Sequence, residues 1–199
     1  MRTALGVCLL ILVSALTGCA SMRRIHSDVL TVANAPAGTV LQGARYRFER
    51  LPSQINNPEA GMAEQQAEAA MAAVGLVRDD ANARISVLVG FSGMSYLTDA
   101  YGRPWSGPWV PYGHISVGRG IYPQWGISMQ MPPTATYRRE VSLLMRDLST
   151  GQIVYETRAA HEGPWNDATA IFTALFQAAL SQFPTPPTGP RRVTIDLAR

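Results

Sequence analysis

Residues 137–160 constrain the fold more than any other stretch of this chain. Two alternating runs, YRREVSLLMR over 137–146 and QIVYETRAA over 152–160, flank the turn-forming residues DLSTG. Alternation with period two is typical of half-buried strands, and Asp, Ser, Thr and Gly are residues that favour tight turns. The segment therefore predicts an antiparallel hairpin, which has to bury one face against other elements.

Two helices carry apolar faces that suit this role. Asn57-Pro58-Glu59 predicts a capped helix start, and Gly75 predicts its end. Asn166 is expected to cap a second helix that Pro184 stops. Its apolar positions recur at helical spacing: Ala168, Ile171, Phe172, Leu175, Phe176, Ala179, Leu180 and Phe183.

Four further runs have strand character, over residues 29–33, 44–49, 84–91 and 193–197, the last of them a candidate edge strand. The order is thus β-β-α-β, a long insert, then β-β-α-β. We predict an α+β fold, with a largely antiparallel sheet and two helices packed on one face.

The expected insert, residues 92–136, is rich in glycine, proline and aromatic residues. A structureless loop of this length is unusual inside a compact domain and is often functional. Segments 114–117 and 127–131 alternate, so a small hairpin is expected inside it. Five rings lie at or beside turns and form a candidate binding surface: Trp105, Trp109, Tyr112, Tyr122 and Trp125. Packing of these rings on the chain's own sheet is the alternative to contact with a protein, a membrane or a glycan.

The N-terminus indicates export and lipidation. A basic start precedes an uncharged run from Ala4 to Leu16, which is shorter than the roughly 20 residues of a membrane-spanning helix. Leu16-Thr17-Gly18-Cys19 resembles the lipobox of bacterial lipoproteins. That resemblance implies cleavage after Gly18, acylation of Cys19 and an anchor in the membrane. In that family Ala20 favours the outer membrane, with the protein facing the periplasm.

These boundaries divide the chain into a signal peptide over residues 1–18, a lipidated tether over 19–28 and a single domain over 29–199. Cys8 would leave with the signal and Cys19 would carry lipid, so the mature chain would hold no thiol for a disulfide or a metal. The hydrophobic fraction of 47% is that of a globular protein. A net charge of +3 without a long basic run does not favour nucleic acid.

Catalytic motifs are sparse. None of the three histidines has a second ligand at metal-binding spacing, and we expect neither metal nor cofactor. His161-Glu162, near Asp167, is the one cluster with acid–base potential, although a local structural role is the more common one for such a residue. We therefore expect a protein that is not an enzyme.

Four of these features together resemble one bacterial lipoprotein family, catalogued as domain of unknown function 4136. They are the lipobox, the segment GLVRDDANARISVLVGF, the aromatic insert and the hairpin RDLSTGQIVYETRA before a helix ending SQFP. Tyr155 stands where the family more often has tryptophan. The resemblance implies an envelope lipoprotein and no particular activity. We expect contact with an envelope partner through the insert, with peptidoglycan or glycan binding as the alternative.

Overall fold

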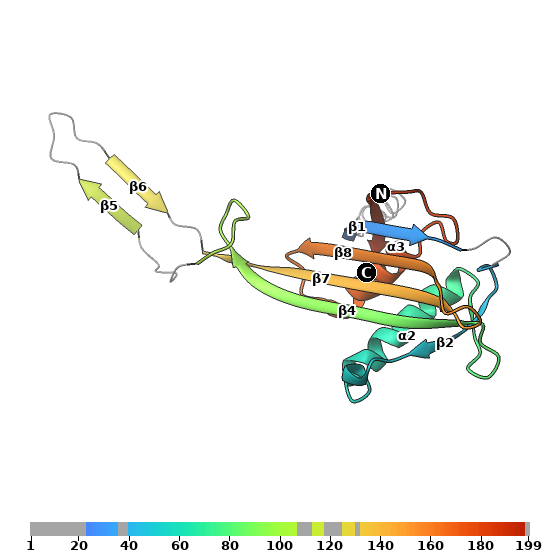
Figure 1. Ribbon diagram of the computed structural model, residues 1–199. Helices are drawn as coiled ribbons and strands as arrows, with labels where there is room; N and C mark the ends of the chain where they lie inside the picture. The colour runs from blue at the N-terminus through green and yellow to red at the C-terminus, as the bar shows by residue number, and fades with distance from the viewer. Residues whose placement is uncertain (1–22, 36–39, 107–112, 118–124, 130–131, 198–199) are drawn as a thin grey trace, which may run out of the picture.

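The computed structural model describes residues 23–35, 40–106, 113–117, 125–129 and 132–197. Figure 1 shows a sheet backed by two helices, with a long pair of strands extending from it. In chain order the elements are β1 (Arg23–Ala33), β2 (Arg45–Glu49), a 3₁₀ turn η1 (Pro52–Gln54), α2 (Pro58–Ala73), β3 (Val77–Arg78), β4 (Ile85–Thr98), β5 (Gly113–Val117), β6 (Trp125–Met129), β7 (Thr134–Asp147), β8 (Ile153–Gly163), α3 (Ala168–Ala179) and β9 (Arg191–Leu197).

The main sheet has seven strands in the order β3-β2-β4-β7-β8-β1-β9. The α+β class with two helices is confirmed, but the sheet is mixed, so the prediction of a largely antiparallel sheet is wrong. β2 runs parallel to both β3 and β4, whereas the other pairings are antiparallel. The cause is α2, because a helical crossover returns the chain to the end from which the previous strand started.

The sheet has one helix-covered face and one open face. Cross-strand partners such as Val89 and Leu143, or Val141 and Ala159, are buried together under the helices. The open face carries cross-strand ion pairs between neighbouring strands, including Arg158 with Glu140 at 3.0 Å. Alternation along each strand therefore separates a single hydrophobic core from a polar surface.

Both helices begin at side-chain caps. The Asn57 side chain accepts a hydrogen bond from the Glu59 N–H at 2.9 Å, as predicted, and Gly75 follows α2 with a φ of +89°. The cap of α3 is Asp167, which accepts from the Ala170 N–H, so the prediction of Asn166 is wrong by one residue. The Asn166 carbonyl instead accepts a hydrogen bond from Arg139. Within the described ranges, neither helix has the length and apolarity of a membrane span.

β1 begins at Arg23, so residues 23–28 of the expected tether are part of the sheet. Ile25, Ser27 and Val29 are buried, and pairing with β8 and β9 on either side fixes this short alternating run as a strand. Asp28 pairs with Ala160, close to the end of β8. The start of β1 therefore lies at the end of the sheet from which the long strands project (Figure 1).

Strands β4 and β7 are longer than predicted and take up both ends of the expected insert. They pair without interruption from Ile85 with Asp147 to Thr98 with Thr134. Residues 92–98 and 134–136 are consequently strand, held by cross-strand pairing despite a local sequence rich in Gly, Ser and Thr. Farther along the insert, β5 and β6 pair as the expected small hairpin.

The predicted β7–β8 hairpin is confirmed, and its turn is organised by Asp147. Asp147 is 2% exposed, and its Oδ1 accepts from the Ser149 N–H, the Ser149 hydroxyl and the Thr150 N–H at 2.8, 2.5 and 3.2 Å. Its Oδ2 lies 3.6 Å from Arg84 Nε. The Ser149 hydroxyl is the main cause that holds the pKa of Asp147 below its ordinary value, and the two N–H groups add to it.

Candidate functional site

The candidate site is the arm, defined here as residues 92–106 and 134–140. It consists of the distal halves of β4 and β7 with the loop that follows β4 (Figure 1). Near its end the Thr98 hydroxyl contacts the Thr134 carbonyl at 3.1 Å and the Thr136 hydroxyl at 3.0 Å. Thr98 is buried, so these hydrogen bonds hold β4 and β7 together where their pairing ends.

Asp99 builds the loop beyond β4. Its carboxylate accepts from the N–H groups of Tyr101 and Arg103, each at 2.9 Å, and from Arg103 Nε at 2.8 Å. Gly102 has a φ of +77°, a conformation that glycine adopts without steric cost. The Arg103 N–H is the main cause that lowers the pKa of Asp99. The loop then returns along β4, because the Trp105 N–H donates to the Leu97 carbonyl at 2.8 Å.

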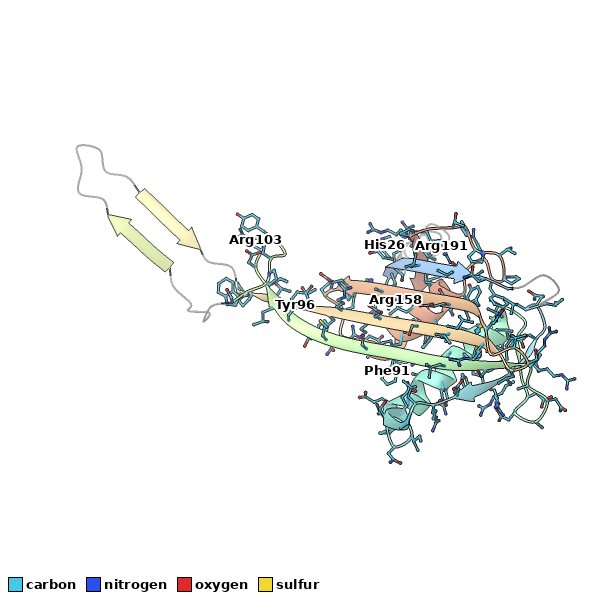
Figure 2. All side chains as sticks on the ribbon, in the orientation of Figure 1. His26, Phe91, Tyr96, Arg103, Arg158 and Arg191 are labelled. Atoms are coloured by element: carbon cyan, nitrogen blue, oxygen red, sulfur yellow. The ribbon has the colours of Figure 1, made fainter. Side chains whose placement is uncertain are left out.

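The arm exposes large apolar side chains. Met94 is 61%, Leu97 47% and Tyr101 84% exposed. The guanidinium of Arg103, a residue labelled in Figure 2, lies over the Tyr101 ring at 5.3 Å from its centroid. Sequence reasoning missed Met94 and Leu97, since it treated residues 92–98 as part of a loop. Both are exposed on a hydrogen-bonded frame, and because side chains alternate along β4 they lie on opposite faces of the arm.

The structure places only part of the predicted surface. Trp105 lies at the base of the arm's loop, partly buried. Trp109, Tyr112, Tyr122 and the proposed lipidation residue Cys19 lie outside the described residues. Trp125 begins β6.

The structure does not bring together the candidate acid–base residues His161, Glu162 and Asp167. His161 is buried on the helix-covered face, where its Nδ1 hydrogen-bonds the His26 carbonyl at 2.8 Å. Glu162 is on the open face and lies 3.7 Å from Arg138, whereas Asp167 caps α3. Across the described ranges, no group of three His, Cys, Asp or Glu side chains is arranged to hold a metal ion.

A groove at the base of the arm is a second candidate surface. It has a volume of about 740 Å³ and lies between β4, the N-terminal half of α2 and the start of α3. Its apolar lining includes Met62, Phe91 and Phe172, and the two phenylalanine rings meet edge to face at 6.5 Å. Arg139 is 6% exposed and also lines the groove. The signal for it was visible in the sequence: Arg139 is a charge at a core-facing position of an alternating strand.

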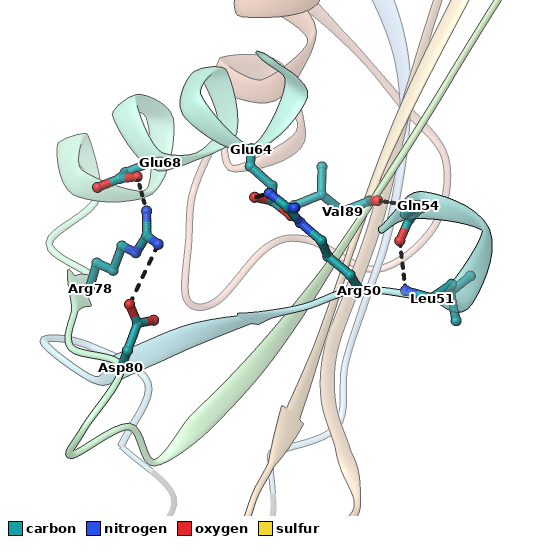
Figure 3. Close-up of polar contacts among 8 residues, drawn as sticks. All are labelled: Arg50, Leu51, Gln54, Glu64, Glu68, Arg78, Asp80 and Val89. Carbon is teal, nitrogen blue, oxygen red and sulfur yellow. Dashed lines mark hydrogen bonds and ion pairs between the residues drawn. The ribbon is translucent and has the colours of Figure 1, made fainter. Parts of the chain in front are cut away.

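Polar contacts hold the segment that borders this groove. Arg50 binds the Glu64 carboxylate through two hydrogen bonds of 2.7 and 2.6 Å (Figure 3). Next to it, Gln54 accepts from the Leu51 N–H and donates from its Nε2 to the Val89 carbonyl at 2.8 Å. These contacts fix η1 against both α2 and the edge of β4.

Comparison with known proteins gives a family. The family model described as Domain of unknown function (DUF4136) matches residues 34–185. This chain belongs to that family. The match spans both helices and the hairpin that carried the resemblance, and the family description assigns no activity. No curated protein matches the chain.

Among solved structures, the chain is similar to a PDZ domain protein from Parabacteroides distasonis ATCC 8503, with 10% identity and a TM-score of 0.51. The likeness covers 87% of this chain but 38% of that protein, and at this identity it shows the fold alone. The chain also resembles the PelC dodecamer from Paraburkholderia phytofirmans, with 15% identity and a TM-score of 0.45, over 78% of this chain and 95% of that one.

Proposed function

We propose that this member of the family is a lipid-anchored protein of the bacterial outer membrane that faces the periplasm. It has no catalytic turnover and works by contact between its arm and another envelope protein. The observation that carries the proposal is the arm itself. It exposes Met94, Leu97 and Tyr101 on a frame that hydrogen bonds of Thr98 and Asp99 hold together. Because this frame is already formed, burying these side chains against a partner requires little further ordering of the chain.

The position of the proposed anchor supports this role. Cys19 precedes the first strand residue, Arg23, by four positions, which span at most about 14 Å when extended. β1 starts at the end of the sheet from which the arm projects, so a lipid on Cys19 would be attached within this short reach of the same end. A lipid on Cys19 would therefore keep the arm close to the membrane, where its partner would be a membrane-bound or membrane-associated protein.

Site-specific photo-crosslinking in living cells tests the proposal. Tyr101 is replaced by p-benzoyl-phenylalanine, which keeps an aromatic ring at an 84% exposed position. The same probe at Gln177, an exposed residue of α3 in the body, is the matched control. We expect a discrete protein adduct at position 101 that does not form at position 177.

Three outcomes would overturn the proposal. Identical adducts from both positions, or no adduct from position 101, would remove the arm as a specific protein contact. A smear at position 101 that muramidase removes would assign the arm to cell-wall glycan, the alternative function. The anchor is tested separately: Cys19→Ala should release the protein from the membrane fraction, and continued membrane retention would contradict lipidation.

A further inference from the structure

The outer edge of β4 has free backbone hydrogen-bonding groups. β4 pairs with β7 in one unbroken register, so alternate residues point their N–H and C=O groups away from β7. The carbonyls of Val89 and Leu97 accept from groups outside β7, which identifies the odd-numbered residues as the outward ones. Phe91, Gly93 and Ser95 are thus the outward residues between them, and no backbone partner on that side occurs in the described part of the chain.

This free edge, residues 91–95, is blocked at both ends and is called the window below. At one end the Gln54 side chain occupies the Val89 carbonyl (Figure 3), and at the other end the Trp105 N–H occupies the Leu97 carbonyl. The window from Phe91 to Ser95 is therefore about 17 Å long at 3.4 Å per residue. An edge of this length can pair with one short extended segment.

The groove lies beneath this window on the helix-covered side. Phe91 and Gly93 belong to both features, since they line the groove and direct backbone groups to the edge. A strand added to β4 would alternate its side chains between the open face and the groove. Those entering the groove would meet Met62, Phe91 and Phe172. Backbone pairing combined with a side-chain pocket is the arrangement that recognises extended peptides.

The positive charge of Arg139 in the groove predicts the chemical type of one side chain of the added strand. Arg139 donates from Nη1 to the Trp165 carbonyl at 2.8 Å and from Nη2 to the Asn166 carbonyl at 3.1 Å. These are neutral acceptors. The neighbouring Asp167 carboxylate lies 3.8 Å from Arg23 Nη2; its charge also attracts Arg139, but the two form no ion pair. Burial is the main cause that lowers the pKa of Arg139. One carboxylate, the exposed Glu59, stands at the α2 rim of the groove. A buried cation that lacks an ion-pair partner favours an incoming carboxylate.

We infer that the β4 edge binds an extended segment of a partner protein as an added strand, with apolar side chains and one acidic side chain directed into the groove. This site includes the base of the arm, but its contacts are the backbone edge of β4 and the groove, whereas the proposed function rests on the exposed side chains of Met94, Leu97 and Tyr101. The inference therefore does not depend on the proposed function, and peptide binding can be tested separately from crosslinking at position 101. Its occupant is a linear segment, so the partner need not be folded where it binds.

Selection from a random linear dodecapeptide library on the full-length protein in mild detergent tests the inference. We expect enriched sequences to alternate apolar and polar residues and to contain an acidic residue at a fixed position. One enriched peptide, fluorescein-labelled, is then titrated by fluorescence anisotropy against two variants. Gly93→Pro removes an outward N–H, whereas Gly93→Ala keeps it and places Cβ at ordinary contact distances of 3.9 Å from Phe172 and 4.0 Å from Arg139.

We expect Gly93→Pro to bind at least tenfold more weakly than Gly93→Ala, which retains the N–H. Changes in the peptide test the same contacts without altering the fold. N-methylation of the alternate residues that pair with β4 should abolish binding, while N-methylation of the intervening residues should not. Glu→Gln in the peptide should weaken binding at least tenfold. The inference is overturned if no peptide is enriched, or if N-methylation at either set of positions has the same effect.

Discussion

Replacing Asp147 by Asn should destabilise the fold, because one buried oxygen of this carboxylate organises the β7–β8 turn. Hydrogen bonds to a charged acceptor contribute about 1.5–3 kcal/mol each, against about 0.5–1.5 kcal/mol for a neutral acceptor. The three donors of Ser149 and Thr150 share Oδ1, so their contributions do not add in full. The amide oxygen of Asn can still accept these bonds, and its NH₂ group would face Arg84. We expect the free energy of unfolding to fall by about 2 kcal/mol at neutral pH.

The pH dependence of this loss makes the prediction specific. The pKa of Asp147 is lower in the folded chain than its ordinary value of about 3.9. Its charge therefore contributes fully above pH 4, and that contribution is lost as the pH falls through the folded pKa. The difference between the wild type and Asp147→Asn should be constant from pH 7 to pH 5 and shrink below pH 4.

Urea unfolding followed by circular dichroism at pH 7, 5 and 3 measures this difference. Asp28→Asn is the matched control, because the Asp28 side chain is 72% exposed and its pairing with Arg192 lies on the surface. We expect the control to change the unfolding free energy by less than about 0.5 kcal/mol. An equal effect of the two substitutions at pH 7, or a loss for Asp147→Asn that is the same at pH 3, would refute the role assigned to the carboxylate.

Two other predictions concern the core and the arm. Leu175→Ala should lower the free energy of unfolding by about 3 kcal/mol, because Leu175 of α3 is fully buried and its removal leaves a cavity; Gln177→Ala, exposed on the same helix, is the control in the same urea titration. Asp99→Ala should speed hydrogen exchange at the amides of Tyr101 and Arg103, which the carboxylate binds, while the amides of β8 stay as protected as in the wild type. Unchanged exchange at both amides would mean that the loop is ordered without Asp99.

The elements predicted well from the sequence are those whose cause is local. The turn after Asp147 and the cap at Asn57 are fixed by side chains that bind the adjacent backbone, so a few consecutive residues suffice to recognise them. The parallel pairing of β2 with β4 depends instead on where α2 returns the chain, which no single segment encodes. Residues 92–98 are strand because β7 pairs with them, and their own Gly and Ser content points to a loop.

The candidate site also combines features that the local sequence predicts with features that depend on three-dimensional packing. The aromatic insert was recognised by its composition, but the exposed residues of the arm depend on a strand that the local pattern does not show. The groove could be located only from three-dimensional packing, because it joins α2, β4 and α3, which are far apart in the chain. Arg139 was the one local clue, since it is a charge placed among Val141, Leu143 and Met145 on the buried face.

Because β4 and β7 run without a break from the core into the arm, the arm and the body of the domain move together. Their proximal halves are clamped in the core by residues such as Val87 and Met145, while their distal halves project beyond it. A strand of this length spans about 48 Å, so tilting the body by about 10° would move the far end by about 8 Å. A pull along the arm would act on the β4–β7 hydrogen bonds in shear, because these bonds run perpendicular to the strands, and the same ladder continues into the centre of the sheet. A partner that binds the far end of the arm would therefore also set the orientation of the body, including the directions in which the open face and the β4 edge point.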